Sequence, residues 1–318
     1  MLTGLSAGVT WALETVVLGI ALGMSPFVSS EQAILLAPFV STFLHDSFSA
    51  LFLLFYNLVR GKAKEFFGVF KSTSFKWLVL ASAIGGPVGM TGYVLAVNYM
   101  GASIGAVASA VYPAIGTLLA FIFLKEEVRW HRWLFLFFTL LGVFGLSYSP
   151  SLNVENFWLG LLGAFMCAFG WGIEAVILAK CLKNPTIKNE YALNIRQFTS
   201  ALIYGAIILP LLGGWGFTAG LFTGGMGVLL LTLALAALCA TVSYLLYYET
   251  INKSGASRAM ALNITYTAWA IVFTVILLRD FSVLRPFTLF CAAVVVVCGI
   301  LSATDVTKLI KKLKELKK

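Results

Sequence analysis

Charged residues and cysteines are both scarce in this sequence. Of its 318 residues, 11% are charged and 60% are hydrophobic, and five are cysteines. A chain with so little polar surface cannot coat a soluble globule of this size, so we predict an integral membrane protein. The cysteines lack the spacing of metal ligands, and we expect them to pack as small hydrophobic side chains. We therefore predict no metal site and no cofactor.

Several catalytic motifs are also missing. The sequence has no phosphate-binding loop, no His-Glu-x-x-His and no Cys-x-x-Cys. Carboxylates within the membrane can serve an intramembrane enzyme. However, the internal repeat described below is explained by transport and not by catalysis. We therefore expect that the protein is not an enzyme.

Long apolar segments fill most of the chain, and charges, Gly, Pro and Asn divide them into lengths that suit a membrane helix. This pattern predicts an all-α membrane protein with ten transmembrane helices. The expected spans are 2–23, 33–58, 77–99, 103–124, 133–149, 157–180, 191–212, 228–251, 259–278 and 286–304.

Basic residues orient these spans, because Lys and Arg next to a span stay on the cytoplasmic side. With both termini in the cytoplasm, only Arg279 and Arg285 of the 22 basic residues fall outside. We expect a multi-pass protein of the plasma membrane with both termini cytoplasmic. The net charge of +9 then follows from topology and implies no nucleic-acid partner. Residues 307–318 form a basic amphipathic tail, expected to rest on membrane lipids.

A Trp-x-x-Glu motif occurs twice, as Trp11 with Glu14 and about 160 residues later as Trp171 with Glu174. In each copy the two side chains share one helix face near the middle of a span. A shift of 154 residues aligns further parts of the two halves. The aligned parts are Tyr93 with Tyr247, Gly101-Ala102-Ser103 with Gly255-Ala256-Ser257, Tyr112 with Tyr266, and Lys125-Glu126 with Arg279-Asp280.

The repeat predicts two five-helix units, residues 1–150 and 151–306, ahead of the tail at 307–318. Because each unit has an odd number of spans, the two must insert in opposite orientations. Inverted repeats of this kind build secondary transporters, whose substrate site lies near the midplane between the halves.

The chain resembles the drug/metabolite transporter superfamily, in particular its EamA-type ten-helix branch. The resemblance rests on the two inverted five-helix repeats, the two Gly-Ala-Ser turns and the charged turn Lys125-Glu126-Glu127. The duplicated Trp-x-x-Glu with many tyrosines at membrane depth resembles, more narrowly, the choline-uptake permeases of that superfamily. This resemblance implies a ten-helix transporter for choline or a related quaternary ammonium.

Recognition of a quaternary ammonium requires aromatic faces and a nearby carboxylate, because such a cation has no proton to donate. The chain offers both at membrane depth. Aromatic residues also form interfacial belts or simple packing, and that alternative stays open for each of them. The predicted substrate-binding residues are Trp11, Glu14, Tyr93, Tyr112, Trp171, Glu174, Tyr244, Tyr247 and Tyr266.

Carboxylates inside the membrane cost at least ~2.5 kcal/mol each on insertion scales, so they should face a cavity or a partner. We expect no Lys or Arg in the membrane layer of Glu14 and Glu174, which leaves them protonated or facing water and a cation. Candidates for proton coupling are Glu14, Glu174, His45, Asp46 and Glu249. His45 and Asp46 can equally form a buried pair with Ser41 or Ser49, and Glu249 an interfacial pair with Lys253.

These features predict a secondary transporter that imports choline or a related quaternary ammonium by alternating access. Import is driven by membrane potential, by proton symport, or by both. An inside-negative potential supplies about 2.3 kcal/mol per charge per 100 mV. Two alternatives stay open. One is a transporter of aromatic amino acids or other amphipathic metabolites, and the other is a membrane sensor or scaffold that transports nothing.

Overall fold

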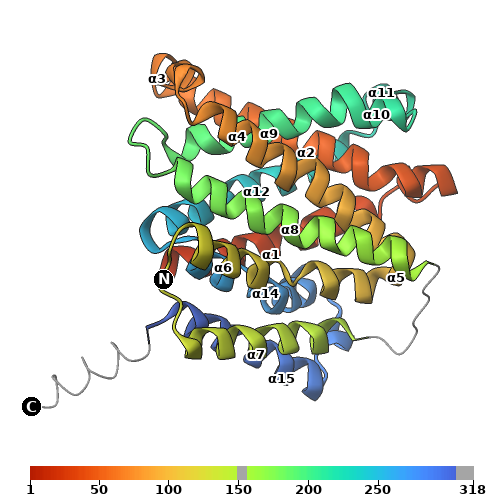
Figure 1. Ribbon diagram of the computed structural model, residues 1–318. Coiled ribbons are helices and arrows are strands. Elements are labelled where there is room, and N and C mark those ends of the chain that lie inside the picture. The colour runs from red at the N-terminus through yellow and green to blue at the C-terminus, as the bar shows by residue number, and fades with distance from the viewer. Residues whose placement is uncertain (149–155, 306–318) are drawn as a thin grey trace, which may run out of the picture.

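The computed structural model describes residues 1–148 and 156–305 (Figure 1). Within these ranges the chain is helical and contains no strand, so the predicted all-α membrane fold is confirmed. Nine of the described helices are long and apolar enough to cross a membrane, and Tyr112–Phe123 is a shorter apolar helix. The predicted tail at 307–318 lies outside the described residues.

The first half of the chain supplies seven α-helices, and α4 continues through a π-helical turn into α5. In order, they are α1 (Leu2–Leu22), α2 (Glu31–Val59), α3 (Ala63–Gly68), α4 (Phe75–Ala83), the turn η2 (Ile84–Val88), α5 (Gly89–Ser109), α6 (Tyr112–Phe123) and α7 (Trp130–Ser147). A 3-10 turn, η1 (Val69–Lys71), precedes α4.

The second half has the same character, with π-helical turns after α9 and α14. Its helices are α8 (Phe157–Cys181), α9 (Asn189–Ile203), the turn η3 (Tyr204–Ile208), α10 (Leu209–Leu211), α11 (Trp215–Thr223), α12 (Gly227–Ser254), α13 (Ala256–Asn263), α14 (Tyr266–Phe273), the turn η4 (Thr274–Leu278) and α15 (Pro286–Ala303). A 3-10 turn, η5 (Phe281–Val283), precedes α15.

Local sequence signals begin several of these helices. The side chain of Ser30 accepts a hydrogen bond from the backbone of Ala33, and that of Asn156 from Leu159, as N-caps of α2 and α8. Pro286 opens α15, where a missing N–H costs nothing. The predicted break between the spans 77–99 and 103–124 agrees with the structure, because α5 has non-helical dihedral angles and a kink at Gly101, where the apolar span that starts at Phe75 ends.

The two halves interlock and do not sit side by side. Helix α1 packs mainly against α12 and α14, whereas α8 packs against α5 and α6. Each copy of the Trp-x-x-Glu motif is therefore surrounded by helices of the opposite half. Figure 1 shows α1 and α8 crossing the middle of the bundle, with α2 and α9 on one side and α7 and α15 on the other.

Two unusual backbone conformations recur at positions related by the 154-residue shift. Gly101 has φ 80° and ψ 157°, and Gly255 has φ 90° and ψ 162°. Lys125 and Arg279 are non-glycine residues with left-handed φ values of 55° and 53°. Such conformations are uncommon for L-residues, so their recurrence at matched positions indicates a shared local fold.

A polar cluster ties the α6–α7 turn to the second half. The carboxylate of Glu126 accepts hydrogen bonds from the backbone N–H groups of Ala256 and Ser257, at 2.7 and 3.2 Å, and so caps α13. Arg132 donates to the Ser257 hydroxyl at 3.0 Å and to the carbonyl of Ser302 at 2.6 Å. We predicted Arg132 among the cytoplasmic flanking charges, but it is buried in α7 because these partners satisfy its guanidinium.

The repeat-related Asp280 makes a different contact. Its carboxylate accepts a hydrogen bond from the backbone N–H of Ser282 at 2.9 Å, within its own turn, and its side chain is exposed. The hydrogen bonds from Ser282 hold the pKa of Asp280 below its usual value. The acidic turns of the two repeats therefore differ, since Glu126 joins the halves and Asp280 bonds locally.

Candidate substrate-binding site

A cavity of about 90 Å³ lies in the middle of the bundle. Its walls come from α1, α5, α6, α8, α9, α12, α13 and α14, so both halves of the chain contribute. Seven of the nine side chains that we predict to bind substrate line this cavity, and Glu14 and Tyr93 do not. The seven are Trp11, Tyr112, Trp171, Glu174, Tyr244, Tyr247 and Tyr266.

The aromatic rings form two groups, one around each tryptophan. Trp11 packs edge-to-face against Tyr244, with ring centroids 4.8 Å apart, and against Tyr266 at 6.5 Å. Trp171 packs edge-to-face against Tyr112 at 5.5 Å and stacks on Tyr93 at 6.2 Å. Tyr93 is thus placed behind Trp171. The two groups present electron-rich ring faces to one cavity.

Glu174 in this cavity is paired with an arginine. The Arg196 Nε lies 3.1 Å from Oε1 of Glu174, and its Nη1 lies 3.4 Å from Oδ2 of Asp46. Its guanidinium also sits over the ring of Tyr244, with Cζ 5.0 Å from the centroid. The expectation that no basic residue shares the layer of Glu174 is therefore wrong.

The error over Arg196 has a structural cause. We counted it as a cytoplasmic charge because it stands near the start of a predicted span. Helix α9 begins at Asn189, however, which places Arg196 two turns inside the helix, where it is 6% exposed. Two further polar residues of α9, Gln197 and Ser200, are also buried. Their presence inside an apolar span is the sequence signal that could have indicated a buried polar site around Arg196.

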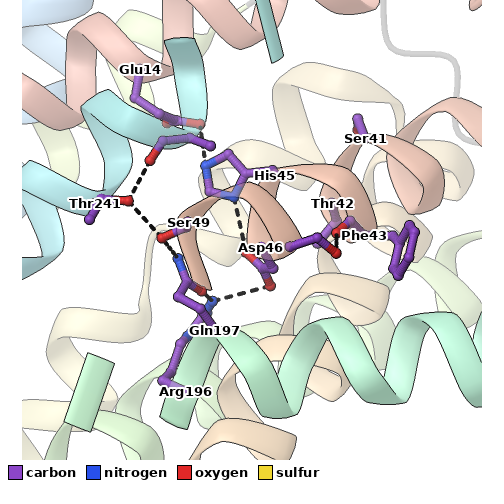
Figure 2. A network of polar contacts seen from close by, with 12 residues as sticks. Glu14, Ser41, Thr42, Phe43, His45, Asp46, Ser49, Arg196, Gln197 and Thr241 are labelled. Carbon is purple, nitrogen blue, oxygen red and sulfur yellow. Dashed lines mark hydrogen bonds and ion pairs between the residues drawn. The ribbon is translucent and has the colours of Figure 1, made fainter. Parts of the chain in front are cut away.

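Glu14 belongs to a different environment. Its Oε1 lies 3.6 Å from Nε2 of His45, and Nδ1 of His45 lies 2.9 Å from Oδ1 of Asp46 (Figure 2). Through Asp46 and Arg196 this series of contacts continues to Glu174. A chain of ionisable groups therefore runs from α1 through α2 and α9 to α8.

The serines proposed as alternative partners of this pair bond elsewhere. Ser41 donates to the carbonyl of Pro38 in its own helix. Ser49 accepts a hydrogen bond from Gln197 at 2.9 Å and lies 2.6 Å from the hydroxyl of Thr241, as Figure 2 shows. These polar contacts hold α2, α9 and α12 together beside the ionisable chain.

Formal charges leave the cluster negative. Three carboxylates, of Glu14, Asp46 and Glu174, face one guanidinium, of Arg196, and one imidazole, of His45. Even with a protonated imidazole the sum is one negative charge. Such a buried excess favours a cation or a proton nearby.

Glu249 lies away from the cavity. Its carboxylate is 2.6 Å from Nζ of Lys253 and accepts a hydrogen bond from Asn189 at 2.7 Å, near the end of α12. This geometry corresponds to the interfacial pair that we gave as the alternative to proton coupling.

The segment from α4 to α5 packs closely against the second Trp-x-x-Glu motif. A Cβ added at Gly85, in the π-helical turn, would overlap the carboxylate of Glu174. A Cβ at Gly89 would lie 3.0 Å from Cδ1 of Trp171. Close backbone approach at these two glycines therefore fixes where Trp171 and Glu174 lie. A π-helical turn at such a place is typical of functional sites.

No cluster of three His, Cys, Asp or Glu side chains suited to a metal ion occurs within residues 1–148 and 156–305. Cys167 and Cys291 lie within helices α8 and α15.

The geometry defines a multi-pass membrane protein with a central cavity for a small molecule, and the comparisons agree. Residues 1–148 match the model of the EamA-like transporter family. The chain is 26% identical over 288 residues to protein LicB of Haemophilus influenzae, and the match covers 91% of each chain. The predicted resemblance to the drug/metabolite transporter superfamily is confirmed.

A solved structure, described as the crystal structure of a protein, shares the fold. It matches with a TM-score of 0.68 at 17% identity, and the match covers 97% of both chains. At this identity the likeness shows the fold alone. The match to the EamA-like transporter family and the similarity to LicB point to a membrane transporter rather than an enzyme.

Proposed function

We propose that this protein imports choline or a related quaternary ammonium across the plasma membrane by alternating access between its two repeats. One observation carries the proposal: Trp11 and Trp171, from the two copies of the motif, line the same cavity, with Glu174 among them. A methylated ammonium is held by aromatic faces and a carboxylate, and this cavity offers both.

The side chains divide the work of binding. Trp11, Trp171 and the tyrosines around them supply ring faces, and Glu174 supplies negative charge. Arg196 compensates the charge of Glu174 and covers one face of Tyr244. A bound cation competes with Arg196 for both of these groups, so each of the two cations can balance the carboxylate.

Proton exchange has candidate groups in Glu14, His45 and Asp46, and Arg196, which stays protonated, links them electrostatically to Glu174. We assign Glu14 and His45 to proton exchange and Glu174 to the substrate. The ordinary pKa of an imidazole lies nearer to neutral pH than that of any other side chain, which suits His45 to this role. With cytoplasmic termini and an inside-negative potential, the membrane adds about 2.3 kcal/mol per charge per 100 mV to uptake.

Calorimetry on the purified protein tests the proposal. Choline is titrated into the parent protein and into Trp171→Ala, with 3,3-dimethylbutanol as its uncharged isostere. We expect choline to bind, the isostere not to bind, and the variant to lose at least about tenfold in affinity, since a desolvated cation–π contact is worth about 2 kcal/mol. A parent protein that does not bind choline would overturn the proposal.

One observation favours the aromatic amino acids as second candidate substrates. Arg196 lines the cavity, and a guanidinium is a strong partner for a carboxylate. Its existing contacts with Glu174 and Asp46 weigh against this role. Titration of the parent protein with tryptophan and phenylalanine distinguishes the candidates, because these ligands carry a carboxylate that choline lacks.

A further inference from the structure

Asn263 contributes a polar group to the proposed cation site. It is the last residue of α13 and lines the cavity. Its Nδ2 donates a hydrogen bond to the hydroxyl of Tyr112 at 3.1 Å. Its other amide atom, Oδ1, is buried and has no hydrogen-bond partner among the residues that the structure describes.

A buried acceptor without a partner costs free energy, and in native proteins nearly all such groups are satisfied. The amide oxygen of Asn263 accepts hydrogen bonds and cannot donate them. The group that satisfies it must therefore bring an O–H or N–H. A fully methylated ammonium has neither, so the donor must sit elsewhere on the substrate.

Tyr112 connects this amide to the aromatic groups. Its hydroxyl holds Nδ2 of Asn263, and its ring meets Trp171 edge-to-face at a centroid distance of 5.5 Å. Asn263, Tyr112 and Trp171 all line the one cavity. The Oδ1 of Asn263, a hydrogen-bond acceptor, therefore lies beside the aromatic rings that we propose to hold the ammonium group of the ligand.

We infer that Oδ1 of Asn263 accepts a hydrogen bond from a hydroxyl on the substrate, so that the site selects quaternary ammonium alcohols. This inference rests on the proposed cation site and adds the chemistry of the other end of the ligand. Tetramethylammonium leaves the acceptor unpaired. A carboxylate, as in a betaine, brings further acceptors and places negative charge against the amide oxygen.

A matched pair of ligands isolates this contact. Choline and its methyl ether, (2-methoxyethyl)trimethylammonium, carry the same charge and the same methylated head, but the ether has no hydroxyl to donate. We expect the parent protein to bind choline about tenfold more tightly than the ether, as for one buried hydrogen bond lost. Both dissociation constants are measured by calorimetry on the purified full-length protein.

Substitution of Asn263 should remove the preference and keep the cation site. In Asn263→Leu we expect the two ligands to bind with equal affinity, within about threefold of the parent's affinity for the ether. Tyr248→Phe is the matched control, because Tyr248 also lines the cavity and its buried hydroxyl has no hydrogen-bond partner among the described residues. That variant should keep the tenfold preference. Asn263→Ala is judged by the same ratio if Asn263→Leu does not fold.

The outcomes separate this inference from the proposed function. Equal binding of both ligands to the parent overturns the hydroxyl contact and leaves the cation site standing. A preference that survives in Asn263→Leu or Asn263→Ala, or is lost in Tyr248→Phe, overturns the role of Asn263. A parent protein that binds neither ligand overturns the cation site and this inference together.

Discussion

The two copies of the Trp-x-x-Glu motif differ in their carboxylates and not in their tryptophans. Trp11 and Trp171 both line the cavity and both pack edge-to-face against tyrosines. Glu174 lines the cavity and contacts Arg196, whereas Glu14 is 4% exposed and faces His45 behind the cavity wall. The two copies of the motif are therefore alike in the placement of their tryptophans beside the cavity, and they differ in the partners of their carboxylates.

The difference arises from neighbouring helices. At the offset that relates the two motifs, the counterpart of His45 is Gly205, and the counterpart of Arg196 is Leu36. Neither charged partner was duplicated. The two tryptophans therefore have similar aromatic surroundings, whereas the two carboxylates have different partners, as the proposed division between substrate binding and proton exchange requires.

Removal of Arg196 is expected to have the largest effect. In Arg196→Met, Glu174 and Asp46 lose their shared cation while they remain buried, and breaking such a pair costs about 3–5 kcal/mol of unfolding free energy. Thermal unfolding in detergent measures the loss. Lys188→Met is the control, because Lys188 pairs with Glu65 at an exposed site and its loss should leave the midpoint nearly unchanged. An unchanged midpoint in Arg196→Met would mean that Glu174 is held neutral, as Glu14 can be.

Substitution of Gly85 should disturb the second copy of the motif alone. In Gly85→Ala the new methyl group overlaps the Glu174 carboxylate, and overpacking of this kind costs about 1–3 kcal/mol. We expect a lower thermal midpoint and weaker choline binding. Gly19→Ala on α1 is the control, since a Cβ there meets no atom within 4 Å. Equal behaviour of the two variants would contradict the close approach of η2 to α8.

The two glutamates should respond differently to neutral substitution. We expect Glu174→Gln to weaken choline binding about tenfold, for the loss of a charge near the cation. Glu14→Gln should change choline binding less than about threefold and should remove the pH dependence of uptake into proteoliposomes. If Glu14→Gln weakens binding as much as Glu174→Gln does, the two carboxylates form one site and the proposed division between them fails.

The acidic turns should show the smallest difference between the repeats. Glu126→Ala removes the cap of α13, and loss of a helix cap costs about 1 kcal/mol. Asp280→Ala removes a bond within an exposed turn and should leave the thermal midpoint nearly unchanged. A drop of equal size in both variants would argue against a special role for the contact between Glu126 and α13.

Much of the fold was predictable because membrane insertion depends on local properties. Apolar length determines which segments span, and the predicted spans near residues 2–23, 157–180 and 286–304 agree closely with α1, α8 and α15. The depth of Trp11 and Trp171 followed from the same pattern. The break at Gly101 was also predictable, because the Gly-Ala-Ser turn that begins there separates two of the predicted spans.

The class of protein, the apolar segments and the duplicated motif can all be read from the sequence, because each depends on a short stretch of consecutive residues. The partners of the polar side chains follow only from the folded structure. Arg196 contacts Glu174 and Asp46, Glu14 contacts His45, and Asn263 donates a hydrogen bond to Tyr112. These contacts depend on which helix faces oppose one another, and residues far apart in the chain, such as Asn263 and Tyr112, carry no mark of their pairing until the helices pack.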